Sequence, residues 1–198
     1  MSATDEQIQQ ALEALRNGEL IVFPTETLYG IGCDALNPEA VARLCDAKKR
    51  PAGKPLAVIL GETSMADQLT SDFSPAATRL AESYWPGPLT LVLPARENLP
   101  EAIVGDQTIG LRVSSDPVAA RLSRELGRPI CAPSANPTGL PPAPGARGAR
   151  AYFDKDVAVY LDDGPRDGEA STVVIPGPPL KILRSGPISE ESLRQKLD

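Results

Sequence analysis

Apolar positions in this chain switch between the spacing of a helix face and the continuous runs of short buried strands. Ile8, Leu12 and Leu15 lie on one face of a helix expected at residues 5–17, and Gly18 ends it. A β-rich run follows, and the alternation of the two patterns continues to the C-terminal end. It predicts further helices at 38–48, 75–84, 117–127, 146–153 and 190–197, and strands at 19–23, 56–60, 89–93, 108–113, 129–132, 157–161, 171–175 and 180–184.

Capping residues and prolines mark where several of these helices begin. Asn37-Pro38, Ser74-Pro75 and Asp116-Pro117 each place a capping side chain before a proline at the first helical position. Residues 24–32 and 133–148 are expected to be loops, the second ordered and rich in proline and glycine. Strands that alternate with helices predict an α/β fold around a twisted, mixed sheet. Because no repeat or interdomain linker is visible, the whole chain of 198 residues is expected to form one domain.

Composition narrows the class of protein. Apolar residues make up 41% of the chain and charged residues 23%, as in soluble globular proteins. The net charge of −6 argues against a protein that grips nucleic acid through a broad basic face, although it leaves room for a local basic pocket. No apolar run approaches the roughly 18 residues of a membrane span. Residues 1–10 do not form a signal peptide, so we expect a cytoplasmic protein without membrane contact.

Two residue types limit the chemistry available. The chain has no histidine, which removes the usual general base and the Ser-His-Asp triad. Cys33, Cys45 and Cys131 form no C-x-x-C pair, so we expect small buried thiols in a reducing compartment and no zinc site. Catalysis must therefore use lysine, arginine, hydroxyl, amide or carboxylate side chains, backbone amides or a bound cation.

The densest positive cluster is the segment KKRPAGKP at 48–55, between the end of a predicted helix and the start of a strand. Cations at a helix C-terminus complement the helix dipole, which is one interpretation. The other is a clamp for phosphate groups. Four cations on a loop stiffened by proline and glycine have a low ordering cost and can meet a triphosphate from several sides.

Two loops that follow predicted strands carry polar side chains. Ser134 and Asn136 follow the strand at 129–132, and ligands of α/β proteins often bind where strands end. The alternative is a turn that caps the strand. Residues 24–30, PTETLYG, carry two threonine hydroxyls and a carboxylate, which suits either a small polar ligand or a plain turn.

Arg112 is unusual because it lies inside the apolar run at 108–113. A buried arginine needs an acidic partner, which is either a structural carboxylate or a carboxylate of a substrate. Ser171-Thr172 and Arg184 open and close a late pair of strands, and each can equally be a routine surface residue.

Together, seven segments resemble the YrdC/Sua5 family of threonylcarbamoyl-AMP synthases. The resemblance runs from about residue 20 to residue 186, and the segments occur in the family's order and at familiar spacings. One such segment would be a weak signal, whereas seven in order are specific. They are PTETLYGIG (24–32), KKRPAGKPL (48–56), WPGPLTLVL (85–93), TIGLRV (108–113), SANPTG (134–139), STVV (171–174) and ILRSG (182–186).

The resemblance implies a fold, an activity and a set of ligands. The fold is a twisted open α/β sheet flanked by helices, with a concave, positively charged cavity. The activity is the synthesis of threonylcarbamoyl-AMP from L-threonine, bicarbonate or CO₂ and ATP, the first step toward threonylcarbamoyladenosine in tRNA. Mg²⁺ is expected to arrive with ATP, because the sequence shows no dedicated cluster of metal ligands. A downstream tRNA-modifying transferase complex is a candidate partner, with weak or no autonomous binding of tRNA.

The resemblance also implies roles for residues that match the family's motifs. These residues are Lys48, Arg50, Ser134 and Asn136 for catalysis, Arg50, Lys54, Thr108, Asn136 and Arg184 for ATP, and Thr27, Arg112, Ser134 and Ser171 for L-threonine. The implied nucleophile is the carbamate of threonine, which is already anionic. A site without histidine therefore suffices if it orients two anions and neutralises the phosphates.

Two positions depart from the family's pattern. Val58-Ile59 stands where members often have a histidine, and Ile175 stands where they often have an aspartate. Both changes bear on how threonine is held. From the length we expect the short, single-domain form of the family. Two alternatives remain: a non-catalytic relative that binds double-stranded RNA or ribosomes, and a carbamoyl-phosphate-using transferase, whose zinc-finger-like and acylphosphatase segments this sequence lacks.

Overall fold

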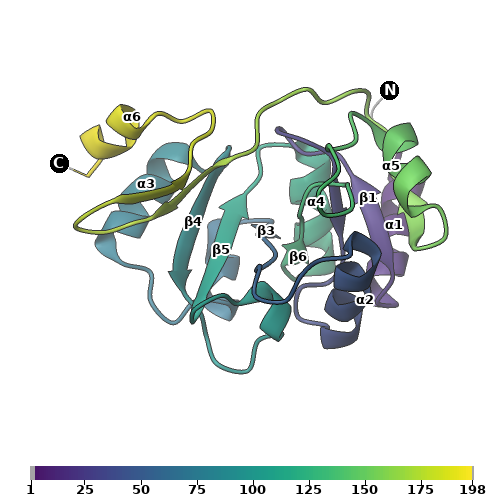
Figure 1. Ribbon diagram of the computed structural model, residues 1–198, viewed down its shortest axis with the longest axis horizontal. Helices are drawn as coiled ribbons and strands as arrows, with labels where there is room; N and C mark the ends of the chain where they lie inside the picture. The colour runs from purple at the N-terminus through teal and green to yellow at the C-terminus, as the bar shows by residue number, and fades with distance from the viewer. Residues whose placement is uncertain (1–2, 198) are drawn as a thin grey trace.

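The computed structural model describes residues 3–197, which form two β-sheets flanked by helices (Figure 1). The smaller sheet has the strand order β2-β1-β7 and the larger one β6-β3-β5-β4-β8-β9, and both mix parallel and antiparallel neighbours. The predicted α/β fold with mixed, open sheets is confirmed, although the strands divide into two sheets.

The strands are β1 (Leu20–Phe23), β2 (Gly30–Gly32), β3 (Val58–Leu60), β4 (Leu89–Pro94), β5 (Thr108–Val113), β6 (Ile130–Cys131), β7 (Val157–Tyr160), β8 (Thr172–Ile175) and β9 (Lys181–Arg184). The α-helices are α1 (Asp5–Arg16), α2 (Pro38–Lys48), α3 (Pro75–Tyr84), α4 (Pro117–Leu126), α5 (Ala146–Phe153) and α6 (Glu190–Gln195), and the 3₁₀-helices are η1 (Thr63–Gln68) and η2 (Glu101–Ile103).

Side chains that alternate along the central strands divide the hydrophobic core into two clusters. In β1, Leu20 and Val22 belong to the larger cluster, and Ile21 and Phe23 to the smaller one. This follows from the geometry of a strand, in which successive side chains point to opposite faces. The smaller cluster includes the apolar faces of α1 and α4, whereas the larger one includes those of α2, α3 and α5. β1 is therefore buried on both faces.

The capping residues predicted from the sequence begin the helices as expected. The side chains of Asn37, Ser74 and Asp116 each accept hydrogen bonds from backbone N–H groups of the first turn, and proline follows each of them. Gly127 ends α4 in the left-handed conformation, with φ at 71°. No helix within residues 3–197 is long and apolar enough to cross a membrane.

Backbone hydrogen bonds join the two sheets between β2 and β6. Segments 30–35 and 129–134 run antiparallel and exchange three backbone bonds of 2.9 to 3.0 Å. At one end of this contact, Gly30 pairs with Ser134. The junction therefore places the loop that follows β1 beside the loop that follows β6.

The expectation of a continuous loop over residues 24–32 is wrong at its end, because Gly30–Gly32 forms β2. Two glycines in three residues have little intrinsic preference for a strand, so tertiary pairing decides the conformation. Gly32 has no room for a side chain, since a Cβ atom there would lie 2.2 Å from the carbonyl oxygen of Cys131. The two 3₁₀-helices are also absent from the sequence-based prediction.

The segment between β7 and β8 connects the two sheets. It leaves the smaller sheet after Tyr160 and crosses to the larger sheet, where β8 begins at Thr172 (Figure 1). The first and last helices, α1 and α6, lie at opposite ends of the long axis of the molecule (Figure 1). This crossing brings residues 161–171 close to the junction of the sheets.

Gly32→Ala is expected to lower the free energy of unfolding by about 1–3 kcal/mol, because the added methyl group overlaps the backbone of the facing segment. Equilibrium urea denaturation measures this change. Gly145→Ala is the matched control, since a Cβ atom at Gly145 meets no atom within 4 Å. Its effect is expected to stay within about 1 kcal/mol. Equal stability of the two variants would contradict the close packing of the sheet junction.

Candidate functional site

Two adjoining cavities lie at the junction of the sheets. The smaller has a volume of about 190 Å³ and borders the loop after β1, and the larger has a volume of about 420 Å³ and faces β4, β5, β8 and β9. Their common walls place a ligand in one cavity next to a ligand in the other. The residues that line both are Ala57, Thr90, Pro133, Ser134 and Arg184.

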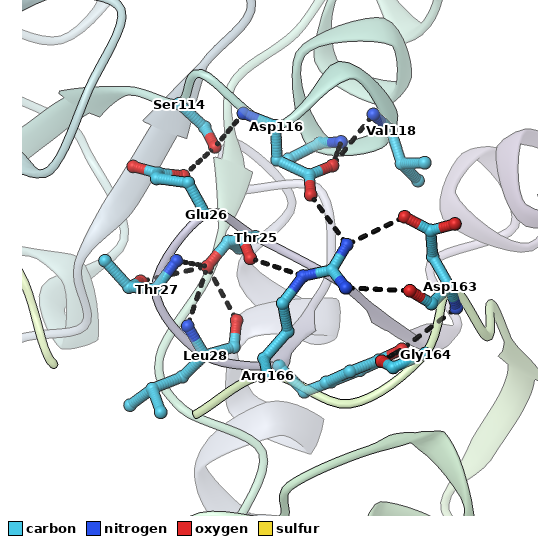
Figure 2. A network of polar contacts seen from close by, with 12 residues as sticks. Thr25, Glu26, Thr27, Leu28, Ser114, Asp116, Val118, Asp163, Gly164 and Arg166 are labelled. Carbon is cyan, nitrogen blue, oxygen red and sulfur yellow. Dashed lines mark hydrogen bonds and ion pairs between the residues drawn. The ribbon is translucent and has the colours of Figure 1, made fainter. Parts of the chain in front are cut away.

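Arg112 lines the smaller cavity, and its charge is met by a carboxylate of the chain itself. Only 7% of the residue is exposed, and its Nη1 forms an ion pair with Oε1 of Glu26. The other carboxylate oxygen of Glu26 accepts a hydrogen bond from the hydroxyl of Ser114, as Figure 2 shows. Within residues 3–197, Glu26 is the only acceptor for the guanidinium of Arg112, so the remaining guanidinium N–H groups are available to an anionic ligand.

The hydroxyl of Thr25 holds the loop after β1 in a tight turn. It accepts hydrogen bonds from the backbone N–H groups of Thr27 and Leu28, both at 3.2 Å, and donates one to the Leu28 carbonyl at 2.6 Å. The Thr27 hydroxyl lies 3.0 Å from it. This turn fixes Thr27 in the wall of the smaller cavity.

Arg166 fastens the same loop from the crossing segment. Its guanidinium donates to the carbonyl oxygen of Thr25 at 3.1 Å, to a carboxylate oxygen of Asp163 at 2.7 Å and to one of Asp116 at 3.3 Å (Figure 2). Asp116 is also the cap of α4. The Arg166 side chain thus ties the crossing segment both to the turn at residues 25–28 and to the start of α4.

Arg184 and Ser171 form a second polar wall of the smaller cavity. Nε and Nη2 of Arg184 donate to the carbonyl oxygen of Ser171 at 3.0 and 2.8 Å, and the Ser171 hydroxyl lies 2.8 Å from that of Thr90. Burial lowers the pKa of Arg184, and the positive charge of Arg112 adds to this effect. The guanidinium groups of Arg112 and Arg184 therefore both border the smaller cavity, and of the two only Arg112 is paired with a carboxylate, that of Glu26. The excess of positive charge favours an anionic ligand.

The larger cavity combines apolar and basic surfaces. Val92, Val173 and Leu183 supply apolar side chains from β4, β8 and β9, and Leu183 is 56% exposed. Thr108 adds a hydroxyl, Arg50 a guanidinium and Asp106 a carboxylate to the lining of this cavity. A flat apolar group with an anionic tail fits this combination.

Arg50 and Lys54 belong to one loop and both border a cavity beside α2, but only Arg50 also lines the larger of the two adjoining cavities. Arg50 donates to the carbonyl oxygens of Lys54 at 2.8 Å and Pro55 at 2.7 Å, and burial lowers its pKa. Lys54 is exposed and lines a third cavity of about 410 Å³ between this loop, α2 and η2. The structure therefore does not bring Lys54 to the walls shared by the first two cavities.

Lys48 and Asn136 lie behind the cavity walls. The Lys48 ammonium donates to the carbonyl oxygens of Ser134 and Asn136, both at 2.5 Å, and the residue is only 2% exposed. Burial, reinforced by the charge of Arg50, lowers the pKa of Lys48 to about 8. The Asn136 amide nitrogen donates to the carbonyl oxygens of Pro137 and Leu140, and its Oδ1 has no partner within residues 3–197.

Most of the site residues predicted from the sequence converge on the two cavities. The sequence assigned no role to Thr90. It placed the Glu26 carboxylate in a candidate ligand loop and required a partner for a buried Arg112, but it did not join the two. In the described part of the chain, no group of three or more Cys, Asp or Glu side chains is placed to hold a metal ion. The predicted residues on the walls are Thr27, Arg112, Ser134, Ser171 and Arg184 for the smaller cavity, and Arg50, Thr108, Ser134 and Arg184 for the larger.

Known proteins resemble this chain over nearly its whole length. A threonylcarbamoyl-AMP synthase of Bacillus subtilis is 38% identical over 98% of this chain and 57% of its own length. A putative threonylcarbamoyl-AMP synthase of Mycobacterium tuberculosis is 38% identical over 96% of this chain and 88% of its own. The solved structure of Pyrococcus abyssi Sua5 complexed with L-threonine matches with a TM-score of 0.91 and 36% identity, over 96% of this chain and 57% of that one. This chain thus spans little more than half the length of two of these relatives.

A family model agrees with these similarities. The model of the Sua5/YciO/YrdC family, described by the words telomere recombination, matches residues 13–186. The match includes every residue that lines the two adjoining cavities. The chain therefore belongs to the Sua5/YciO/YrdC family.

Proposed function

We propose that this protein makes threonylcarbamoyl-AMP and pyrophosphate from L-threonine, bicarbonate or CO₂ and ATP, and so supplies the modification of adenosine in tRNA. One observation carries the proposal: an anion-favouring cavity of about 190 Å³, bordered by Arg112, shares a wall with a cavity of about 420 Å³ that holds Arg50. The two cavities suit an amino acid and a nucleotide held side by side. The names of the Bacillus subtilis and Mycobacterium tuberculosis relatives support this reading.

L-Threonine is proposed to occupy the smaller cavity. Its carboxylate would pair with the N–H groups of Arg112 that Glu26 leaves unused, in charge-assisted hydrogen bonds. The hydroxyls of Thr27 and Ser171 and the wall at Ser134 would hold the rest of the molecule. The P. abyssi complex with L-threonine supports an amino-acid ligand in this fold.

ATP is proposed to occupy the larger cavity. The base would lie on the apolar strip of β4, β8 and β9, with Thr108 beside it and the phosphates toward Arg50 and Arg184. Lys54 would join the phosphates by a turn of its exposed side chain, because Gly53 and Pro55 on either side of it already line this cavity. ATP is taken as its magnesium complex, because Glu26 is already bonded to Arg112 and Ser114, which leaves Asp106 as the one carboxylate among the described residues that line the larger cavity.

The proposed reaction needs orientation and neutralised charge more than a strong base. The amine of threonine combines with CO₂ and loses a proton to give a carbamate. A carbamate oxygen then attacks the α-phosphorus of ATP, and pyrophosphate leaves with the electrons of the broken P–O bond. Arg50 and Arg184 would stabilise the charge that develops on the phosphates. A chain without histidine can therefore carry out both steps.

The remaining proposals concern surroundings and partners. We propose a cytoplasmic protein that hands its adenylate to a downstream tRNA-modifying transferase. The alternative, a relative that binds double-stranded RNA or ribosomes without catalysis, has less support, because the chain carries a net charge of −6.

Pyrophosphate release from ATP tests the proposed activity directly. Release is expected only when L-threonine and bicarbonate are both present, and mass spectrometry should detect threonylcarbamoyl-AMP. The matched controls omit each substrate in turn. A folded protein that releases no pyrophosphate with all substrates and magnesium would overturn the proposal and favour the RNA-binding alternative.

Arg112→Gln is expected to raise the KM for L-threonine at least about tenfold, because the loss of one charge-assisted hydrogen bond weakens binding by about that factor. The KM for ATP should change less than about threefold, because Arg112 does not line the larger cavity. Since this change leaves Glu26 without its partner, the double variant Glu26→Gln/Arg112→Gln serves to keep the pair neutral. An unchanged KM for threonine in a folded double variant would refute the assignment of Arg112.

Arg50→Ala is expected to lower kcat/KM for ATP at least about 100-fold, because a guanidinium facing the phosphates is lost. Steady-state pyrophosphate release measures this. Lys49→Ala is the control, since Lys49 is the exposed neighbour and lines neither cavity. Equal turnover in the two variants would remove Arg50 from the phosphate site.

A further inference from the structure

The Lys48 ammonium is one of the most deeply placed charges of the molecule. The residue ends α2 and is 2% exposed, and it belongs to none of the three cavity walls described above. No carboxylate within residues 3–197 forms an ion pair with it. Its acceptors are two backbone carbonyl oxygens, those of Ser134 and Asn136, at 2.5 Å each.

These two oxygens flank Ala135 in the loop that follows β6, so one ammonium holds both ends of a three-residue turn. The backbone of Lys48 adds another bond, since its carbonyl oxygen accepts from the N–H of Thr138 at 2.8 Å. The N–H of Ala135 donates to the carbonyl oxygen of Tyr29 at 2.8 Å, which ties the turn to the loop after β1. The whole turn is therefore fixed between α2 and the sheet junction.

The turn matters because Ser134 lines both adjoining cavities. A compact ammonium with three tetrahedral donors suits two converging carbonyl oxygens in a space closed to solvent, whereas a planar guanidinium is larger and directs its donors differently. If the ammonium were removed, two buried carbonyl oxygens would lose their donors. The turn would then lose the position that presents Ser134 to the ligands.

We propose that Lys48 is a positioning residue that holds the turn at 134–136 by its backbone oxygens and does not contact the phosphates of the nucleotide. The proposal rests on the proposed function for its effect on catalysis. The hydrogen bonds from the Lys48 ammonium to the turn exist in the ligand-free protein, so they can be tested whether or not the enzyme activity is established.

Amide hydrogen exchange of the ligand-free protein is the first test, with Lys48→Met compared against Lys49→Met. Lys48→Met is expected to speed exchange of the Ala135 and Thr138 amides at least about tenfold, because the charge-assisted bonds that hold the turn are lost. Lys49→Met, an exposed neighbour, should leave both amides unchanged. Unchanged exchange in Lys48→Met would overturn the proposal.

Kinetics of the same variants separate positioning from phosphate binding. Lys48→Met is expected to raise the KM for L-threonine and for ATP together, each at least about fivefold, because Ser134 lines both cavities. Lys48→Arg should not restore either value. A direct phosphate contact predicts the opposite: only the KM for ATP rises, and arginine restores it.

A measurement on the unaltered protein covers the case in which Lys48→Met does not fold. The Lys48 ammonium should give a slowly exchanging ¹H–¹⁵N signal in the ligand-free protein, because it is buried and bonded to two carbonyl oxygens. Saturation with a non-hydrolysable ATP analogue should leave that signal slowly exchanging and shifted little. A fast-exchanging signal without ligand, or one that becomes protected only with the analogue, would overturn the proposal.

Discussion

The antiparallel contact between residues 30–35 and 129–134 is the constraint on which the rest of the structure depends. Its backbone bonds join the smaller sheet to the larger one and place the turn at residues 25–28 opposite the turn at 134–136. The contact is so close that Gly32 cannot carry a side chain. Both cavities open at this junction, so a shift of one sheet against the other would change the walls of each.

Backbone oxygens hold several of the cations near the two cavities. Lys48, Arg50 and Arg184 all donate to carbonyl oxygens, whereas Arg112 is paired with a carboxylate. A carbonyl oxygen satisfies a buried N–H group without cancelling its charge. The cations are thus fixed in place while their positive charge remains for an anionic ligand, which is the preorganisation that charge-stabilising catalysis needs.

Local patterns predict much of this fold. Helix caps at Asn37, Ser74 and Asp116 follow from short-range hydrogen bonding, which the sequence displays directly. The strand at Gly30–Gly32 was not predicted, because glycine has little preference for strands and one side of this strand bonds to the distant segment 129–134.

In the candidate site, too, some features follow from local sequence and others from contacts between distant segments. Motifs identify which residues approach the cavities, but not what each side chain does there. Glu26 as the partner of Arg112, and the burial of Lys48 against two carbonyl oxygens, depend on the path of the whole chain. Lys54 lies four residues from Arg50 in the same motif, yet of the two only Arg50 lines the larger adjoining cavity.

The most direct test of this account is a structure of the protein with L-threonine and a non-hydrolysable ATP analogue bound. The account predicts the amino-acid carboxylate on Arg112, the phosphates against Arg50 and Arg184, and the Lys48 ammonium still on the carbonyl oxygens of the turn. An amino acid bound away from Arg112, or a nucleotide seated in the third cavity beside α2, would contradict it.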